Sequence, residues 1–89
     1  MQVQILYGSE IQSKEQLHVL LAQRLSFPSH YGNNLDALYD CLCERSKAVQ
    51  LIIAEKEALS ENLADYGKQF LQVLTDAAAE NPLLTIQYR

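Results

Sequence analysis

Residues 48–55 read AVQLIIAE, a nearly continuous apolar run that is rich in β-branched side chains. A strand with one face in water alternates apolar and polar residues. A run without that alternation is typical of a strand buried on both faces, as in the middle of a parallel sheet. We therefore expect this segment to be the central strand, with the other elements arranged around it.

Two further strands are predicted near the ends of the chain. Residues 3–7 alternate and carry β-branched and aromatic side chains before Gly8, which is typical of a strand ended by a turn. Residues 83–88 predict a third strand that finishes the chain.

Four helices are expected between these strands. The first opens with Ser13 and Gln16 in a capping-box pattern, the second begins after Asn34, whose side chain suits an N-cap, and the last ends at Asn81 and Pro82. The expected spans are residues 13–25, 34–44, 55–63 and 66–81. In the last helix the side chains expected to point inward are Phe70, Leu71, Val73, Leu74 and Ala77.

The order of these elements predicts the fold class. Strands that alternate with helices are joined by helical crossovers and run parallel. We expect an α/β fold in which a small three-stranded parallel sheet packs with about four helices. With 89 residues and 48% hydrophobic content, the chain fits one domain over residues 1–89.

Charge and composition favour one class of partner. Eleven acidic and seven basic residues give a formal net charge of -4, which repels nucleic acid and anionic lipid and attracts basic proteins. The first ten residues lack the regions of a signal peptide, and no apolar run is long enough to span a bilayer. The cysteines, Cys41 and Cys43, suit a reducing compartment as free thiols. We expect a soluble cytoplasmic protein that binds neither nucleic acid nor membrane.

Catalytic and cofactor chemistry find little support in the residues present. A serine or cysteine hydrolase needs a base beside its nucleophile, and the histidines are His18, in a predicted helix, and His30, in a loop. An enzyme that uses His30 with Cys43 or Asp40 is the weakest functional hypothesis. The glycines stand alone and the cysteines lack a zinc spacing, so we expect no enzyme, no cofactor and no metal.

The segment from His30 to Leu42, HYGNNLDALYDCL, has two aspartates four residues apart and no basic residue. On a helix, Asp36 and Asp40 share one face, which Glu44 extends, and each like-charge pair costs about 0.2–0.5 kcal/mol. We call these three residues the acidic ridge. Asp36 suits the positive end of the helix dipole, but Asp40 lies beyond its range. The ridge is either an ordinary solvated surface or the binding site of a basic partner, and the pattern alone leaves both open.

Residues 31–42, YGNNLDALYDCL, closely resemble a segment of the barstar family, the intracellular inhibitors of barnase-type bacterial ribonucleases. The tyrosine-glycine loop, the asparagine, both aspartates, the helix leucines and Cys41 match. A weaker similarity covers the whole chain, including FLQVLTDAAAE at residues 70–80. The resemblance implies a family fold of three parallel strands with helices packed around them, in agreement with the order of elements above.

The resemblance also implies a mechanism. In that family the loop before the second helix, together with the helix itself, plugs the active-site cleft of a basic ribonuclease as a 1:1 complex, and carboxylates take the place of RNA phosphates. Asp40 would be the central carboxylate, Asp36 a charge at the rim, and Asp76 a more distant acid that stands where the family has glutamate. The Tyr31 ring and the exposed loop backbone would pack against the nuclease.

Three positions depart from the family pattern. His30 replaces an aromatic residue that contacts the nuclease, Tyr39 replaces a tryptophan, and Arg45 replaces a second tryptophan and would direct positive charge at a basic partner. These departures favour a different cognate nuclease, and they leave open an interaction module of the same fold that neutralises another toxin or basic protein. The expected partner-binding residues are His30, Tyr31, Gly32, Asn34, Asp36, Tyr39, Asp40, Cys43, Glu44, Arg45 and Asp76.

Overall fold

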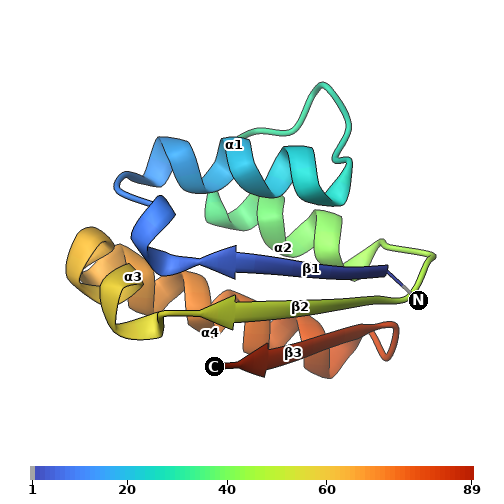
Figure 1. The fold of residues 1–89 in the computed structure, drawn as a ribbon. Coiled ribbons are helices and arrows are strands. Elements are labelled where there is room, and N and C mark those ends of the chain that lie inside the picture. Colours follow the sequence, from blue (N-terminus) through green and yellow to red (C-terminus); the bar gives the residue numbers. More distant parts are fainter. Residues whose placement is uncertain (1) are drawn as a thin grey trace.

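The central strand of the fold is β2 (Val49–Ala54), which lies between β1 (Gln2–Tyr7) and β3 (Leu84–Tyr88) in a three-stranded parallel sheet. The computed structural model describes residues 2–89 and is drawn in Figure 1. Every position of β2 is buried except Gln50, which is half-buried. The prediction of a buried central strand is therefore confirmed.

Helices connect the strands in the predicted order. The 3-10 helix η1 (Gly8–Glu10), α1 (Lys14–Leu25) and α2 (Leu35–Cys43) join β1 to β2, and α3 (Lys56–Leu63) and α4 (Asp65–Glu80) join β2 to β3. In Figure 1, α2 and α4 lie behind the sheet and α1 runs beside β1. Residues 2–89 thus form the expected α/β fold of three parallel strands and four α-helices.

The core lies between the sheet and the helices. Its largest fully buried side chains include Leu6, Leu21, Leu38, Leu42, Leu51, Ile53, Phe70 and Leu74. On the other face of β2, Ile52 is only 3% exposed, and its partners in the neighbouring strands are Ile5 and Gln87. On that same face Val3 and Tyr7 are exposed. The outer face of β2 is thus buried between two flanking strands, although the edge of that face meets solvent.

Local hydrogen bonds begin the first two α-helices where the sequence predicted. Ser13 Oγ accepts from the Gln16 N–H at 3.2 Å, and Asn34 Oδ1 accepts from the Ala37 N–H at 2.8 Å. Each cap satisfies a backbone donor that has no partner within its helix. Gln16 Oε1 accepts from the Gln12 N–H at 2.8 Å, one residue before the N-cap, so the capping box is displaced by one residue.

Helix α4 begins and ends one residue earlier than predicted. Of its expected inward side chains, Phe70, Leu74 and Ala77 are buried, whereas Leu71 and Val73 are half-buried. The difference follows from helix geometry, since residues three and four apart share the centre of the apolar stripe and the others lie on its flanks.

Asn81 joins the end of α4 to the end of α2. Its side chain is 6% exposed, and its Nδ2 donates to the backbone oxygens of Leu42 at 2.9 Å and Arg45 at 3.1 Å. Its Oδ1 accepts from the Leu83 N–H at 3.0 Å. The residue predicted only to stop a helix therefore also holds the carboxyl end of α2 in place.

Candidate protein-binding site

Helix α2 buries one side and presents the acidic ridge on the other. Leu38 and Leu42 have 0% exposure, whereas Asp36, Asp40 and Glu44 are exposed. Residues four apart lie on neighbouring turns of one helix face. The prediction that these carboxylates point away from the core is confirmed, and the ridge is accessible to a partner.

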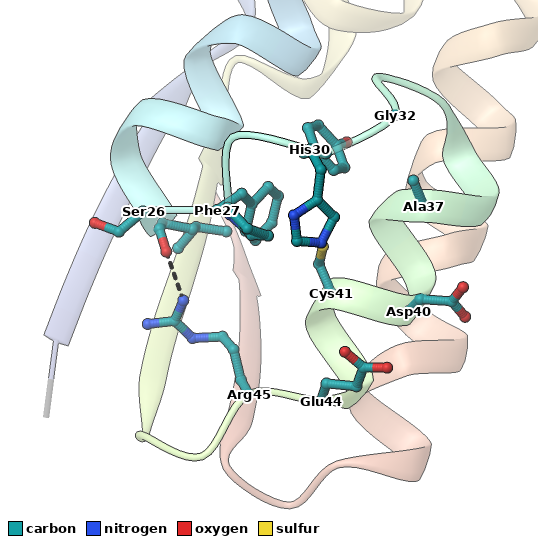
Figure 2. A pocket seen from close by; sticks show the side chains of 12 residues that line it. Ser26, Phe27, His30, Gly32, Ala37, Asp40, Cys41, Glu44 and Arg45 are labelled. Atoms are coloured by element: carbon teal, nitrogen blue, oxygen red, sulfur yellow. Dashed lines mark hydrogen bonds between the residues drawn. The ribbon is translucent and has the colours of Figure 1, made fainter.

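The loop between α1 and α2, residues 26–34, borders a hollow of about 430 Å³ beside the ridge. In Figure 2 the His30 ring extends from the loop toward Cys41, and the carboxylates of Asp40 and Glu44 lie on the α2 side. Phe27 belongs to the apolar lining of the hollow. Apolar walls bordered by carboxylates suit a partner side chain that has an apolar stem and a positive tip.

Gly32 and Asn34 shape the exposed backbone of this loop. Asn34 Nδ2 donates to the Gly32 carbonyl at 3.2 Å. A Cβ atom at Gly32 would lie 3.1 Å from that Nδ2 and 3.5 Å from Ala37 Cβ. A side chain at this position would press on the N-cap of α2, so glycine keeps both the cap and a bare backbone in this exposed loop.

Tyr31 turns its ring into the protein, which corrects the expectation that this ring packs against a partner. The residue is 9% exposed and belongs to the hydrophobic core. Its ring centroid lies 4.8 Å from that of Phe27, and its hydroxyl lies 2.6 Å from His18 Nδ1. A buried tyrosine is favoured when its hydroxyl has a partner inside the fold. The exposed ring of the loop belongs to His30 instead.

His18 is the residue that sequence reasoning missed. It is 1% exposed and hydrogen-bonds to Tyr31 and also, through Nε2, to the Tyr66 hydroxyl at 2.6 Å. Its position beside Leu17 and three residues before Leu21, both buried, was the available signal. A histidine on the apolar side of a helix needs buried hydrogen-bond partners.

Arg45 also differs from the expectation. Its Nη1 donates to the Leu25 carbonyl at 2.7 Å and its Nη2 to Gln2 Oε1 at 3.0 Å. The Leu25 carbonyl belongs to the end of α1, where the helix dipole is negative and favours a cation. The positive charge expected to face a partner is therefore directed at the chain's own α1.

Tyr39 and Cys43 connect the acidic ridge to α4, and both are half-buried. A hydrogen bond with the Cys43 side chain raises the pKa of Tyr39, with further contributions from burial and from the charges of Cys43, Glu80 and Asp76. The two acids of α4 therefore lie close to Tyr39. Asp76 is exposed and accepts from Gln72 Nε2 at 3.0 Å. The negative surface thus continues from α2 onto α4.

The two cysteines, Cys41 and Cys43, are free. Burial raises the pKa of the Cys41 thiol, and the charges of Glu44 and Asp40 raise it further, which disfavours the reactive thiolate. His30 lines the same hollow as Cys41, whereas Cys43 is absent from that lining and pairs with Tyr39. The hypothesis of a His30–Cys43 pair is not supported by this geometry.

Residues 2–89 contain neither a metal-binding cluster nor a membrane-spanning helix. Within that range, no three His, Cys, Asp or Glu side chains are grouped so that they could hold a metal ion. No helix in the same range is long and apolar enough to cross a membrane.

Comparison with known proteins identifies the family of this chain. The family described as Barstar (barnase inhibitor) matches residues 1–88. A protein of Bacillus subtilis (strain 168) named "Putative ribonuclease inhibitor YrdF" is 35% identical over 77 residues, which cover 85% of each chain. The chain therefore belongs to the barstar family, a family of barnase inhibitors rather than enzymes.

Proposed function

We propose that this chain inhibits a basic secreted ribonuclease by inserting the acidic ridge and the preceding loop into the active-site cleft of the enzyme as a 1:1 plug. The acidic ridge carries the proposal, because its three exposed carboxylates lie on successive turns of a helix whose other side is buried. Each like-charge pair costs the free protein about 0.2–0.5 kcal/mol. A cationic cleft would replace this repulsion with attraction.

Asp40 is the central contact in this proposal. It lies between Asp36 and Glu44 on the ridge and also borders the hollow formed by the loop. A ribonuclease holds RNA phosphate with cationic side chains, and a carboxylate placed at the same point would satisfy those cations. Charge-assisted hydrogen bonds of this kind are stronger than neutral ones, provided that every buried charge is paired. A site on a rigid helix also keeps its geometry better than a site on a loop.

The other acids would act mainly on the rate of association. Asp36, Glu44 and Asp76 are exposed, so water and salt screen them more than a carboxylate buried in the complex. A negative surface that faces a basic cleft steers the two proteins together. The association rate should therefore fall as the ionic strength rises.

His30 and Tyr39 would select the partner. His30 is the exposed ring of the loop, and Tyr39 lies between α2 and α4, so both border the proposed contact surface. Specificity depends on the difference in affinity between partners, and residues at the rim change that difference. We propose that the natural target is a ribonuclease of the barnase class that differs from barnase at the facing positions.

We place this activity in the cytoplasm of a bacterium that makes such a nuclease. There an inhibitor would protect cellular RNA before the enzyme is exported. The two free thiols are compatible with a reducing compartment.

A competition assay tests the plug mechanism. A barnase-type ribonuclease is titrated with the wild-type protein while RNA cleavage is followed, in the absence and presence of a non-cleavable RNA analogue. Inhibition that is complete at one equivalent and weakened by the analogue is the expected result. Inhibition that the analogue leaves unchanged would place the contact outside the cleft. No inhibition of any such nuclease would favour a different toxin or another basic protein as the partner.

A further inference from the structure

A buried chain of hydrogen bonds links α4, α1 and the loop of the candidate site. His18 of α1 lies at its centre and is 1% exposed. His18 Nδ1 is 2.6 Å from the hydroxyl of Tyr31, in the loop, and His18 Nε2 is 2.6 Å from the hydroxyl of Tyr66, in α4. The His18 and Tyr31 ring centroids lie 5.7 Å apart, and those of His18 and Tyr66 lie 6.0 Å apart.

The chemistry of the imidazole makes the two contacts depend on each other. A neutral imidazole has one N–H donor and one acceptor nitrogen, and a tyrosine hydroxyl is able to act in either role. The two hydrogen bonds are therefore coupled: when one ring nitrogen donates to its tyrosine hydroxyl, the other nitrogen accepts from its own, and the two roles exchange in the other tautomer. If Tyr66 loses its hydroxyl, Nε2 loses its hydrogen-bond partner and the imidazole is held by the Tyr31 hydroxyl alone.

We propose that Tyr66, acting through His18, is a positioning residue for the partner-binding loop, because it holds Tyr31 inward and so keeps the backbone of residues 30–34 in its binding shape. This inference rests on the function proposed above. Tyr66 belongs to neither the loop nor α2, and the family resemblance did not point to it. The contact surface would thus depend on a hydroxyl that the fourth helix supplies.

The burial of Tyr31 explains why its position affects the shape of the loop. The Tyr31 ring packs on Phe27, and the Tyr31 N–H donates to the Pro28 carbonyl at 3.0 Å, so the residue ties the first half of the loop to the core. The second half is short and ends at the Asn34 cap of α2. A loop that is already ordered avoids the conformational entropy cost of ordering on binding.

The charged groups around His18 come from α1 and α2. Glu15 and Lys14 lie on its own helix, and together with Asp36 of α2 they line a second hollow that His18 and Tyr66 also border. The Lys14 Nζ lies 5.8 Å from the centre of the Tyr66 ring. Burial lowers the pKa of His18, and the nearby Glu15 opposes this effect. The neutral ring, which both hydroxyls satisfy, is therefore the form present at neutral pH.

The experiment uses Tyr66→Phe, which removes only the hydroxyl, with Tyr7→Phe as the matched control because Tyr7 is exposed on β1. In the free protein, Tyr66→Phe should change the ¹⁵N chemical shifts of the His18 ring and accelerate amide exchange in residues 30–34. The expected acceleration is about 2- to 12-fold, which corresponds to one hydrogen bond. Tyr7→Phe should change neither. Unchanged loop exchange and unchanged ring shifts in Tyr66→Phe would overturn the proposal.

Binding to a barnase-type ribonuclease gives the second readout. Tyr66→Phe and Tyr31→Phe should each raise Kd by about 2- to 12-fold. In the double variant Kd should rise about as much as in one of the single variants, because both hydroxyls act through the same contact. If the fold-change in Kd of the double variant equalled the product of the two single fold-changes, the two residues would have independent roles and the inference would be contradicted. If the wild type binds no such nuclease, the function proposed above fails, and the exchange and ring-shift results alone decide whether Tyr66 positions the loop.

Discussion

Replacing Asn81 by alanine should destabilise the protein strongly, because one buried amide side chain forms hydrogen bonds with four backbone groups. The side chain donates to the carbonyls of Leu42 at 2.9 Å, Arg45 at 3.1 Å and, more weakly, Cys43 at 3.4 Å. It accepts from the Leu83 N–H at 3.0 Å. A hydrogen bond contributes about 0.5–1.5 kcal/mol, so the free energy of unfolding should fall by about 2–4 kcal/mol. For a domain of this size that lowers Tm by roughly 8–30 °C.

Urea denaturation followed by circular dichroism measures this loss. The matched control is Asn62→Ala, since Asn62 is exposed and its closest bond is the one that Nδ2 makes with the Ile11 carbonyl at 3.1 Å. The control should lose about 1 kcal/mol or less. If Asn81→Ala lowered the free energy of unfolding no more than the control does, the role of Asn81 in joining α2 to α4 would be refuted.

Three further predictions concern pH, packing and association. The pKa of His18 is lowered in the folded state, so the unfolded chain binds more protons near and below pH 6.5, and the free energy of unfolding should fall as the pH drops through that value. A His18→Gln variant whose free energy of unfolding had the same slope against pH as the wild type would contradict this. Gly8→Ala should lower the free energy of unfolding, measured by urea denaturation, by about 1–3 kcal/mol, because the new Cβ would collide with the Glu55 carbonyl and lie 2.7 Å from the Leu59 nitrogen. An unchanged free energy of unfolding would exclude the collision. Glu44→Gln should slow association with a basic ribonuclease in stopped-flow measurements at low salt and have little effect at high salt; a salt-independent change would contradict a steering role.

Local patterns were sufficient to predict the order of elements and the outer face of α2. The unbroken apolar run of β2 and the side chain of Asn34 act on their own segments, so the sequence near them contains the necessary information. The same is true of the acidic ridge, because the spacing of Asp36, Asp40 and Glu44 against the buried Leu38 is a property of one helix. The structure confirms each of these predictions.

The corrected residues depend on contacts between distant parts of the chain. Tyr31 beside a glycine in a polar loop is typical of an exposed anchor, but its orientation is decided by His18, which is 13 residues away and is itself held by Tyr66. Arg45 similarly finds its acceptor at Leu25, 20 residues earlier. Neither the spacing nor the composition of a segment contains such pairings, so only the folded structure identifies them.

The charge of Asp40 is the most direct test of the proposed mechanism. Calorimetric titration of a barnase-type ribonuclease with Asp40→Asn is compared with Glu61→Gln, which removes the same charge from an exposed position on α3. Losing one partner of a buried charge pair costs about 2–5 kcal/mol, so Asp40→Asn should raise Kd roughly 30- to 4,000-fold, while the control should stay within about 2-fold. Equal values of Kd for the two variants would contradict the account.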